Sequence, residues 1–384
     1  MSSQKPLFAI LDAAESTVER AVLGDLCEIV CYDAKRASDI PESVADAVVV
    51  EVWHTIHVDA ALLARLTRCQ LIVRMGVGYD NVDVAAAGRL GIAVANVPDY
   101  GTEEVADAAL WHILGLFRQC SQLSGRHAHG AVVRGCEGIA AAAGPRTKRV
   151  RGSVLGVVGA GRIGTAVCLR AKPFGFDVVI YDPYVPAGYE KALGVRRCDT
   201  LAQLLGEADC VSLHCNATRD NTRMIDAAAL AAMKAGAFLV NTARGELVDE
   251  DALAGALQTP VSSGGLGGAS IDVAWDEPLV AAADSPRALG RLLAAQRRVQ
   301  HGLDAAAAAR GGGGAPPWVN FISTPHNAWF SKESRREMRR TGAATVRAAL
   351  SGAAGAPLKS VVNAGELDRD ACRLPKELLA VAWR

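Results

Sequence analysis

The chain has 384 residues, half of them hydrophobic, and its 41 basic residues balance its 41 acidic residues. This length exceeds what one hydrophobic core usually supports, so we expect two domains. A balanced charge provides no basic field for nucleic acid or for an anionic membrane surface. No hydrophobic run is long enough to cross a bilayer, and Met1 to Pro6 contain no secretory signal core. We therefore expect no nucleic-acid partner and no membrane insertion.

The cysteines suggest a reducing compartment. There are ten of them, scattered along the chain without a C-x-x-C pair. Zinc sites and disulfide frameworks usually contain closely spaced cysteines, so we predict no metal site and no disulfide scaffold. We expect reduced, mostly buried thiols, which favours a cytoplasmic location.

Short hydrophobic runs of strand length alternate with helical stretches from the start of the chain. The runs of the first set are Leu7–Leu11, Cys27–Tyr32, Ala47–Val52, Leu71–Met75 and Ile92–Ala95. The runs of a second set are Val154–Val158, Val178–Tyr181, Cys210–Leu213, Ala237–Val240, Ala269–Val273 and Phe321–Ser323. Continuous hydrophobic strands separated by helices predict α/β domains with parallel sheets covered on both faces. Residues 103–124 predict a long helix between the two sets.

Residues 280–317 interrupt this pattern. They contain an alanine run at 305–309 and a glycine run at 311–314, so we expect a low-complexity insert on the surface. Ser285-Pro286 resembles a helix start, and part of the insert is therefore expected to be helical. Three leucines would share one face of this helix, namely Leu289, Leu292 and Leu293.

The most specific motif is the glycine-rich turn Gly159-Ala160-Gly161-Arg162-Ile163-Gly164. It follows a predicted strand and opens a helix predicted over 165–175, and the next strand ends at Asp182. Asp182 lies 18 residues beyond Gly164, close to the usual distance for a carboxylate that binds the adenosine ribose. A glycine turn alone would be weak evidence, but this order of elements predicts a dinucleotide site.

Each residue type in this motif has a physical reason. Gly159 permits the tight turn, Gly161 lets the backbone approach a pyrophosphate, and Gly164 lets the helix pack closely on the strand. The helix N-terminus offers unpaired N–H groups to the phosphates. Asp182 would accept hydrogen bonds from both ribose hydroxyls and repel a 2′-phosphate, which favours NAD over NADP as the cofactor.

Further motifs follow one another along the chain, at residues 74–81, 91–98, 240–245, 271–273, 276–278 and 324–329. With these motifs the chain resembles the D-isomer-specific 2-hydroxyacid dehydrogenases, and within them the C-terminal-binding-protein branch. The resemblance covers residues 47–363 apart from the inserts. It implies two Rossmann- or flavodoxin-like parallel-sheet domains, with the NAD-binding domain inserted into a discontinuous substrate domain. The implied substrate domain comprises residues 1–102 plus 327–365, and the implied NAD-binding domain comprises residues 103–326.

Three residues carry the expected catalysis. Arg244 follows a strand at the carboxyl edge of the sheet, and its planar charged fork suits the carboxylate of a 2-oxo acid. His326 would be the general acid and base, giving a proton to the carbonyl oxygen in reduction and removing it in oxidation. Glu277 would hydrogen-bond the other ring nitrogen and fix its tautomer. The alternatives are a structural arginine, a packed core histidine and a solvated turn acid.

The resemblance implies further binding residues. The substrate loop would comprise Arg74, Val77 and Gly78, with backbone N–H groups capping the substrate carboxylate and Val77 also bordering the cofactor. Residues beside the cofactor, in addition to the glycine-rich turn and Asp182, would be Cys215, Asn216, Asn221, Thr242, Ala243, Arg244, Asp272, His326 and Trp329. His214 is expected to be a packed residue near the cofactor. Trp329 would shape the substrate pocket with its flat indole, unless it only packs in the core.

The predicted function is an NAD-dependent oxidoreductase that interconverts a D-2-hydroxy acid and a 2-oxo acid. Family resemblance also implies a homodimer. The alternative is an NAD(H)-sensing transcriptional corepressor or scaffold that binds short peptides, in which case a nuclear location is possible. A formate, phosphoglycerate or hydroxypyruvate/glyoxylate enzyme of the same superfamily is a weaker alternative.

Overall fold

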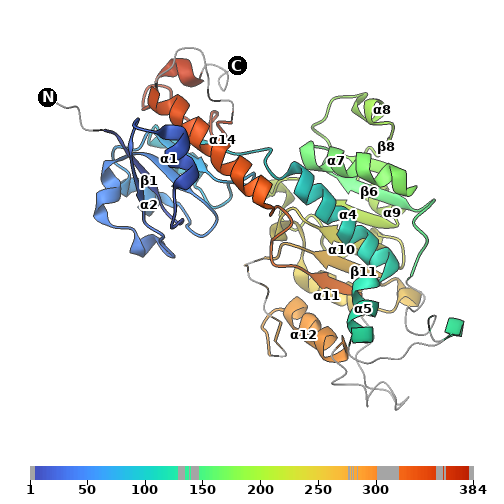
Figure 1. Cartoon of the computed structure of the whole chain (residues 1–384). Helices are drawn as coiled ribbons and strands as arrows, with labels where there is room; N and C mark the ends of the chain where they lie inside the picture. Colours follow the sequence, from blue (N-terminus) through green and yellow to red (C-terminus); the bar gives the residue numbers. More distant parts are fainter. Residues whose placement is uncertain are drawn as a thin grey trace. The chain divides into compact units, whose positions relative to one another are not determined.

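The computed structural model describes residues 5–128, 135–137, 139, 147–275, 277, 279, 281–282, 284–300, 320–351, 358 and 360–379. The chain divides into two compact units, which we call the first unit (Met1–Gly101 with Phe330–Arg384) and the second unit (Thr102–Trp329). Each unit is built around its own sheet (Figure 1). No helix of the described chain combines the length and hydrophobicity that crossing a membrane requires.

The first unit contains a five-stranded parallel sheet in the order β2-β1-β3-β4-β5. Its strands are β1 (Leu7–Ile10), β2 (Glu28–Cys31), β3 (Ala47–Val52), β4 (Leu71–Arg74) and β5 (Ala93–Asn96). This is the doubly wound order found in flavodoxin-like folds. The strands form because their hydrophobic residues are buried on both faces, and every residue of β4 and β5 is buried.

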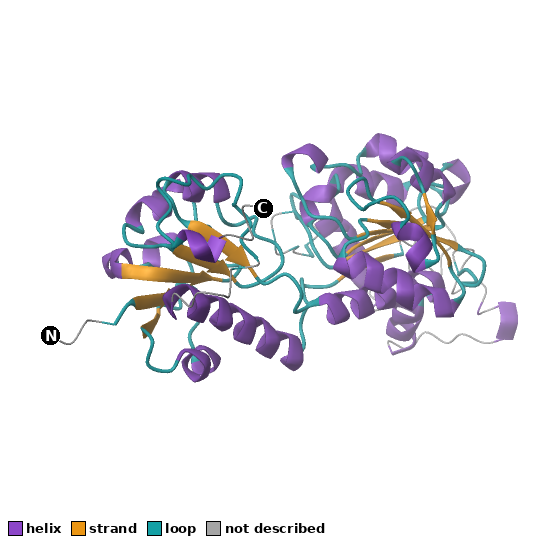
Figure 2. Cartoon of the chain, turned by 90° about the horizontal axis from the view of Figure 1, so that it is seen from above, coloured by secondary structure: helices purple, strands orange, loops and turns teal. Residues whose placement is uncertain are grey.

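Helices lie on both sides of this sheet (Figure 2). They are α1 (Thr17–Leu23), α2 (Ala60–Arg65), α3 (Val84–Arg89) and α14 (Lys332–Ser351), with short 3-10 helices at Ala37–Asp39, Glu42–Asp46 and Lys376–Leu379. Asp59 and Asp83 begin α2 and α3, because each carboxylate accepts a backbone N–H of the first turn at 2.9 Å.

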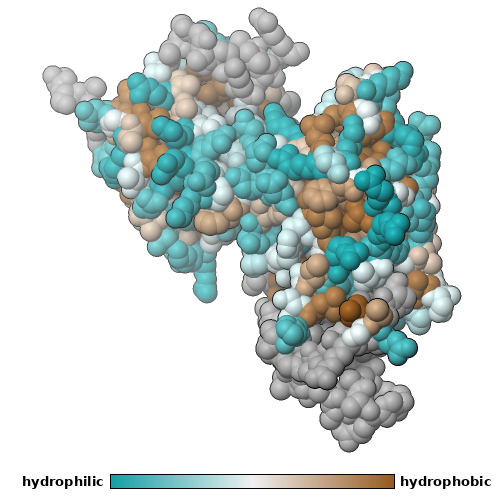
Figure 3. Space-filling model, turned by 45° about the vertical axis from the view of Figure 1, so that its right-hand side comes forward, coloured by the Kyte–Doolittle hydropathy of each residue, from teal (hydrophilic) through white to brown (hydrophobic). Residues whose placement is uncertain are grey.

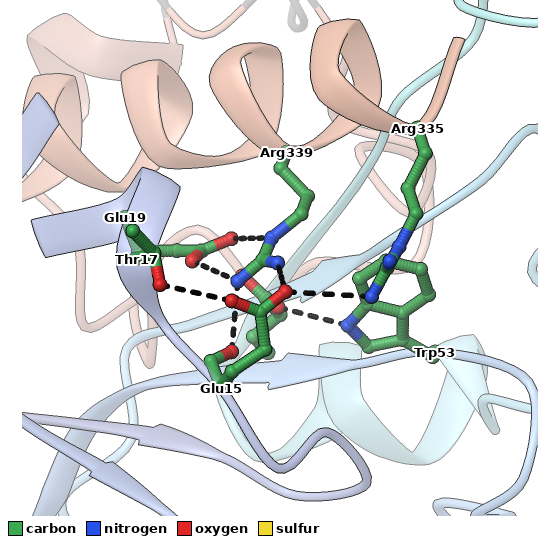
Figure 4. Close-up of polar contacts among 7 residues, drawn as sticks. Glu15, Thr17, Glu19, Trp53, Arg335 and Arg339 are labelled. Carbon is green, nitrogen blue, oxygen red and sulfur yellow. Dashed lines mark hydrogen bonds and ion pairs between the residues drawn. The ribbon is translucent and has the colours of Figure 1, made fainter. Parts of the chain in front are cut away.

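A buried polar cluster joins α1 and α14 in this unit. Arg339 of α14 donates from Nε to Glu19 of α1 at 2.7 Å and also pairs with Glu15 (Figure 4). Both Glu19 and Arg339 are buried, so the pair links α1 to α14, which are far apart in the sequence. Glu51 of β3 is buried as well, and it accepts a hydrogen bond from Trp53 Nε1 at 2.9 Å.

The second unit contains a seven-stranded parallel sheet in the order β12-β11-β10-β9-β6-β7-β8. Its strands are β6 (Val154–Val158), β7 (Asp177–Tyr181), β8 (Arg196–Arg197), β9 (Cys210–Leu213), β10 (Phe238–Asn241), β11 (Gly268–Ile271) and β12 (Phe321–Ser323). Counted from β6, the strand order is that of a Rossmann sheet with one further strand at its edge. The predicted fold class is confirmed.

The helices of the second unit are α4 (Thr102–Arg118), α5 (Cys120–Ala128), α7 (Arg162–Ala171), α8 (Tyr189–Leu193), α9 (Leu201–Glu207), α10 (Ala227–Ala232), α11 (Glu250–Gln258) and α12 (Ala288–Gln300). Short 3-10 helices occur at Lys172–Phe174, Arg219–Asn221, Gly245–Leu247 and Val261–Ser263. The single helix predicted over 103–124 is interrupted at Gln119, whose φ of 50° is left-handed.

The expectation of a surface insert over 280–317 is wrong for its first part. The predicted helix forms as α12, and Leu289 and Leu292 are buried in the core of the second unit. Arg287, just before α12, pairs with Glu250 of α11 at 2.6 Å. The hydrophobic face of α12 therefore decides its placement, whereas residues 301–319 lie outside the described residues.

Candidate active site

The glycine-rich turn between β6 and α7 has the geometry of a phosphate-binding turn. Gly159 has a φ of 92°, and a Cβ there would lie 2.7 Å from the backbone nitrogen of Cys215. A Cβ on Gly164 would lie 1.9 Å from the carbonyl oxygen of Gly159. A Cβ on Gly161 would meet nothing within 4 Å, so the backbone there faces open space. The protein thus requires glycine at 159 and 164, whereas no described protein atom requires it at 161.

Open space at Gly161 coincides with unused hydrogen-bond donors. Gly161 is the N-cap of α7 and has no side chain to cap the helix. Among the described residues, none accepts a hydrogen bond from the backbone N–H of Arg162 or Ile163. Two unused donors and the positive end of the helix dipole create a site for an anion.

Asp182 lies at the end of β7, next to this turn. Its Oδ2 accepts the backbone N–H of Ala160 at 2.7 Å, and its Oδ1 accepts that of Tyr184 at 2.8 Å. Oδ1 also accepts the backbone N–H of Val185 at 3.3 Å, so it is Oδ2 that keeps a lone pair for a further donor. The carboxylate is therefore held beside the turn with acceptor capacity to spare.

The end of β9 forms the neighbouring wall. His214 Nε2 contacts Ser212 Oγ at 2.8 Å, and burial lowers the pKa of His214 to about 4, as expected for a packed, uncharged residue. Burial raises the pKa of the Cys215 thiol to about 11, with a smaller contribution from the charge of Asp182. Asn221 donates from Nδ2 to the carbonyl oxygen of Asn216 at 2.7 Å, which closes this loop.

Asn241, the last residue of β10, shapes the loop that carries Arg244. Its Oδ1 accepts the N–H of Ala243 at 3.0 Å, and its Nδ2 donates to the carbonyl oxygen of Arg244 at 2.8 Å. Arg244 is half-buried and donates to the carbonyl oxygen of Ala243 at 2.7 Å. Thr242 is buried, and its Oγ1 has no partner among the described residues. A buried hydroxyl without a hydrogen-bond partner costs free energy, and a ligand that hydrogen-bonds Thr242 would remove this cost.

Gly245 brings the Arg244 loop against the segment that carries Glu277. A Cβ on Gly245 would lie 2.1 Å from the carbonyl carbon of Ala274, so only glycine permits this approach. Burial raises the pKa of Glu277, but the hydrogen bond and charge of His326, the N–H of Ala274 and the charge of Arg244 outweigh it and lower the pKa overall. Glu277 is therefore a carboxylate near neutral pH, and it senses both His326 and Arg244.

His326 follows β12 and meets Glu277 directly. Its Nδ1 lies 2.7 Å from Glu277 Oε2, so the ionised carboxylate accepts the Nδ1 proton and leaves Nε2 for proton transfer. The backbone of His326 is left-handed, with φ of 53°, which is unusual outside glycine. About a third of its side chain is exposed, so the imidazole is accessible to a ligand.

Asp272, just after β11, holds the loop that carries His326. Its carboxylate accepts Thr324 Oγ1 at 2.6 Å and the backbone N–H groups of Asn327 and Ala328 at 3.0 and 2.9 Å. Its carbonyl oxygen accepts the N–H of His326 at 2.8 Å. These contacts engage Asp272 with its own chain, in addition to the cofactor contact predicted from the resemblance.

Trp329 closes the same loop, because its indole Nε1 donates to the carbonyl oxygen of His326 at 3.1 Å. The structure therefore brings together Arg244, Glu277, His326, Asp272 and Trp329 within the second unit. Asp276 and Pro278, the outer residues of the motif at 276–278, lie outside the described residues.

The substrate loop predicted in the first unit follows β4. Arg74 is buried and donates from Nε to Asn81 at 3.3 Å and from a terminal nitrogen to the carbonyl oxygen of Met75 at 3.0 Å. A Cβ on Gly76 would lie 1.7 Å from the Arg74 guanidinium, which therefore rests on the loop backbone. In the described chain, the N–H groups of Val77 and Gly78 meet no acceptor. They are available to a carboxylate.

The residues present fit a dinucleotide. A bound pyrophosphate would occupy the open space over Gly161 and accept hydrogen bonds from the unused N–H groups of α7. A polar ring substituent would hydrogen-bond the unpartnered hydroxyl of Thr242. All of them lie at the carboxyl ends of parallel strands, where open α/β sheets bind ligands.

Known proteins resemble this chain over most of its length. The family described as "D-isomer specific 2-hydroxyacid dehydrogenase, NAD binding domain" matches residues 110–293. C-terminal-binding protein 1 of Caenorhabditis elegans is 34% identical over 363 residues, which are 94% of this chain and 45% of that protein. D-3-phosphoglycerate dehydrogenase of Mycobacterium leprae (strain TN) is 37% identical over 283 residues, 73% of this chain and 50% of that protein.

A solved structure also resembles this chain over most of its length. D-lactate dehydrogenase from Aquifex aeolicus, complexed with NAD and lactic acid, matches with a TM-score of 0.71 and 27% identity, covering 90% of this chain and 96% of that one. Residues 110–293 carry the NAD-binding domain of the D-isomer-specific 2-hydroxyacid dehydrogenase family, and the relatives and the solved structure resemble the chain beyond this domain. The predicted family is confirmed, with support for the C-terminal-binding-protein-like branch, and so is the NAD cofactor expected for its nucleotide-binding domain.

The chain spans about half the length of the curated relatives it matches. Sequence reasoning missed three residues that shape its site, namely Asn241, Gly245 and Thr324. Asn241 and Gly245 flank the predicted Arg244 motif, and Thr324 begins the His326 motif. Their position beside predicted catalytic residues was the available signal, but their contacts depend on segments distant in sequence.

Proposed function

We propose that this chain is an NAD-dependent oxidoreductase that interconverts a D-2-hydroxy acid and the corresponding 2-oxo acid. The observation that carries the proposal is the joining of His326 to Glu277 at 2.7 Å, with the charge of Arg244 acting on the same carboxylate. An imidazole, a carboxylate that orients it and a fixed cation are the groups that reduction of a charged carbonyl compound requires.

Arg244 and His326 have separate tasks in this proposal. Arg244 holds the substrate carboxylate and polarises the adjacent carbonyl, because its guanidinium is permanently charged and planar. His326 gives the proton on Nε2 to the carbonyl oxygen during reduction and takes it back during oxidation. Glu277 keeps the proton on Nδ1 and stabilises the imidazolium form.

Bound NADH would supply the hydride that reduces the carbonyl carbon. The turn at Gly161 and the N–H groups of Arg162 and Ile163 would hold its pyrophosphate. Asp182 would bind the adenosine ribose and disfavour a 2′-phosphate, so we propose NAD rather than NADP. In the first unit, the N–H groups of Val77 and Gly78 would bind the substrate carboxylate, and Trp329 would select the substrate side chain.

We also propose a homodimer. Trp111 of α4 and Leu169 of α7 are 48% and 52% exposed, and the two helices pack on each other in the second unit. Hydrophobic side chains gather on the visible face of this unit (Figure 3). A second copy of the chain would cover them. Light scattering of Trp111→Glu should give a smaller mass than the unaltered chain, whereas equal masses would contradict this interface.

Steady-state oxidation of NADH with a panel of 2-oxo acids tests the proposed activity. The panel comprises glyoxylate, hydroxypyruvate, phenylpyruvate and 4-methylthio-2-oxobutyrate. Turnover with at least one of them is expected, with NADPH a poorer donor. Tight NADH binding without turnover of any acid would contradict the proposal.

A second candidate is an NAD(H)-sensing binding protein, favoured by the 34% identity to C-terminal-binding protein 1 of Caenorhabditis elegans. In that case the dinucleotide would stabilise the dimer, and the first unit would bind short peptides. Peptide capture that depends on NADH, measured beside the oxo acid panel, separates the two candidates. Capture without turnover would favour the binding protein.

A further inference from the structure

A buried histidine on α4, His112, contacts Thr324 in the segment that leads to His326. His112 is 2% exposed and lies between two hydroxyl groups from distant parts of the second unit. Its Nδ1 is 2.6 Å from Ser270 Oγ on β11, and its Nε2 is 3.4 Å from Thr324 Oγ1 after β12. Thr324 in turn contacts Asp272. We call Ser270, His112, Thr324 and Asp272 the His112 network.

Hydrogen-bond chemistry fixes the direction of this network. Asp272 already accepts two backbone N–H groups, so as a carboxylate it can only accept from Thr324, and the Thr324 hydroxyl donates to it. The oxygen of Thr324 is then an acceptor for His112, which must carry its proton on Nε2. Nδ1 of His112 is left as the acceptor of the Ser270 hydroxyl. Each ring nitrogen of His112 then has one role, and the Thr324 hydroxyl donates to Asp272 while its oxygen accepts from His112.

The charge state of His112 agrees with this direction. Burial lowers the pKa of His112 to about 4, and the opposing charge of Asp272 is too weak to restore it. The imidazole is therefore neutral at physiological pH and can be donor at one nitrogen and acceptor at the other. A protonated ring would have two donors, so Nδ1 could no longer accept the Ser270 hydroxyl.

The His112 network ends at Asp272, which hydrogen-bonds the backbone of the loop that carries His326. Asp272 binds the N–H groups of Asn327 and Ala328 on one side and, through its carbonyl oxygen, the N–H of His326 on the other. His326 has a left-handed φ of 53°, and such a conformation persists only where surrounding contacts hold it. A hydrocarbon side chain at 112 could fill the same space but could not direct the Thr324 hydroxyl.

We propose that His112 is a positioning residue for His326, acting through Thr324 and Asp272 to hold the His326 imidazole against Glu277. This inference rests on the proposed function only for the effect on turnover. The effect on the His326–Glu277 contact is a property of the chain alone, so it can be measured without catalysis.

Nuclear magnetic resonance of protein labelled with ¹⁵N in its histidines gives that measurement. The Nδ1 proton of His326, held by Glu277, should give a downfield resonance that is identified by its loss in His326→Asn. We expect Thr324→Val and His112→Leu to shift or broaden this resonance, and Thr324→Ser, which keeps the hydroxyl, to retain it. His127→Leu, at an exposed position of α5, is the control and should leave it unchanged.

Kinetics provide a second readout. His112→Leu and Thr324→Val should each lower kcat by about tenfold to a hundredfold, because small displacements of a catalytic group are costly, while the Kd for NADH stays within about twofold. The double variant should lose no more than the worse single variant, since both break one pathway. If His112→Leu fails to fold, the Thr324 pair still decides the question.

Several outcomes would overturn the inference. A normal His326 resonance in both His112→Leu and Thr324→Val would show that the network does not position the imidazole. Additive losses of kcat, or losses that follow only a lower Tm and weaker NADH binding, would assign His112 a structural role. If no variant, including the unaltered chain, turns over any acid while the resonance responds as expected, the proposed function fails and the positioning role stands.

Discussion

Asp182 illustrates how much one carboxylate determines in this site. It accepts the N–H of Ala160 in the glycine-rich turn and the N–H of Tyr184 beyond β7, so its position is fixed before any ligand binds. A fixed negative charge at the proposed ribose site would discriminate against a 2′-phosphate through repulsion. We therefore assign the proposed preference for NAD over NADP to Asp182.

Asp182→Asn should weaken that preference, because the amide keeps one oxygen acceptor but loses the charge. We expect the ratio of NADH to NADPH affinity to fall by at least about tenfold, the equivalent of roughly 1.4 kcal/mol. Fluorescence titration of both cofactors measures the ratio, with Asp25→Asn at a fully exposed position of the first unit as the control. An unchanged ratio would remove Asp182 from the account.

At the scale of residues, the sequence could predict positions but not all contacts. Arg244 and His326 follow strands of a parallel sheet, and the ends of such strands meet at one edge. The engagement of Asp272 by three donors could not be predicted, because the donors come from a loop that begins more than 50 residues later. Close approach of Gly245 to Ala274 likewise depends on the folded chain.

At the scale of elements, two glycines of the turn between β6 and α7 differ in what we expect them to contribute. Gly161 is expected to matter for ligand binding, and Gly164 for the stability of the fold. A Cβ on Gly161 meets no protein atom within 4 Å, and its φ of −70° suits any residue. A Cβ on Gly164 would lie 1.9 Å from the carbonyl oxygen of Gly159, so the turn would have to open. Two glycines of one motif therefore have different reasons to be glycine.

Two alanine variants test this separation. Gly161→Ala should keep the Tm nearly unchanged. It should weaken NADH binding by at least about tenfold, because the added methyl group would occupy the space proposed for the pyrophosphate. Gly164→Ala should lower the Tm by several degrees through the backbone clash. Calorimetry and NADH titration of both variants distinguish the effects. Equal behaviour of the two variants would contradict the assignment.

Elements with a hydrophobic run were predictable, and those without one were not. All strands except β8 carry such a run, whereas β8 consists of Arg196 and Arg197 and joins the sheet by backbone pairing with β7. The low-complexity composition of residues 280–317 favours a surface insert, so the burial of α12 could not be predicted, although its leucines recur with a helical period. The break at Gln119 could not be read from a helical pattern, and its side chain contacts Thr147, which lies 28 residues later in the chain.

At the scale of the whole molecule, buried ionisable groups make stability depend on pH in both directions. Burial lowers the pKa of His112 and of His214 to about 4, so the unfolded chain binds more protons below its ordinary histidine pKa of 6.5. Their contribution to stability is lost as the pH falls from about 6.5 to about 4. Burial raises the pKa of Glu51 from 4.5 to about 8, helped by the charge of Glu19. Its contribution is complete below about pH 4.5 and is lost as the pH rises through about 8.

Glu51→Gln tests the alkaline side of this account. The amide stays neutral and still accepts the Trp53 Nε1 hydrogen bond, so the variant avoids the cost of ionising a buried acid. We expect its Tm to exceed that of the unaltered chain by several degrees at pH 9 and by little at pH 5. Glu28→Gln on the surface of β2 is the control. A difference independent of pH would contradict the protonated state of Glu51.

We propose that Arg244, Glu277 and His326 form a proton-transfer and anion-binding site for a 2-oxo acid. The most direct measurement is kcat/KM for NADH-dependent reduction of the best acid by His326→Ala, Arg244→Ala and the unaltered chain, with the Kd for NADH measured in each. Both variants are expected to lose at least about a hundredfold in kcat/KM while still binding NADH, since each removes a group needed only for the reacting substrate. Variants that retain the full kcat/KM would contradict the account.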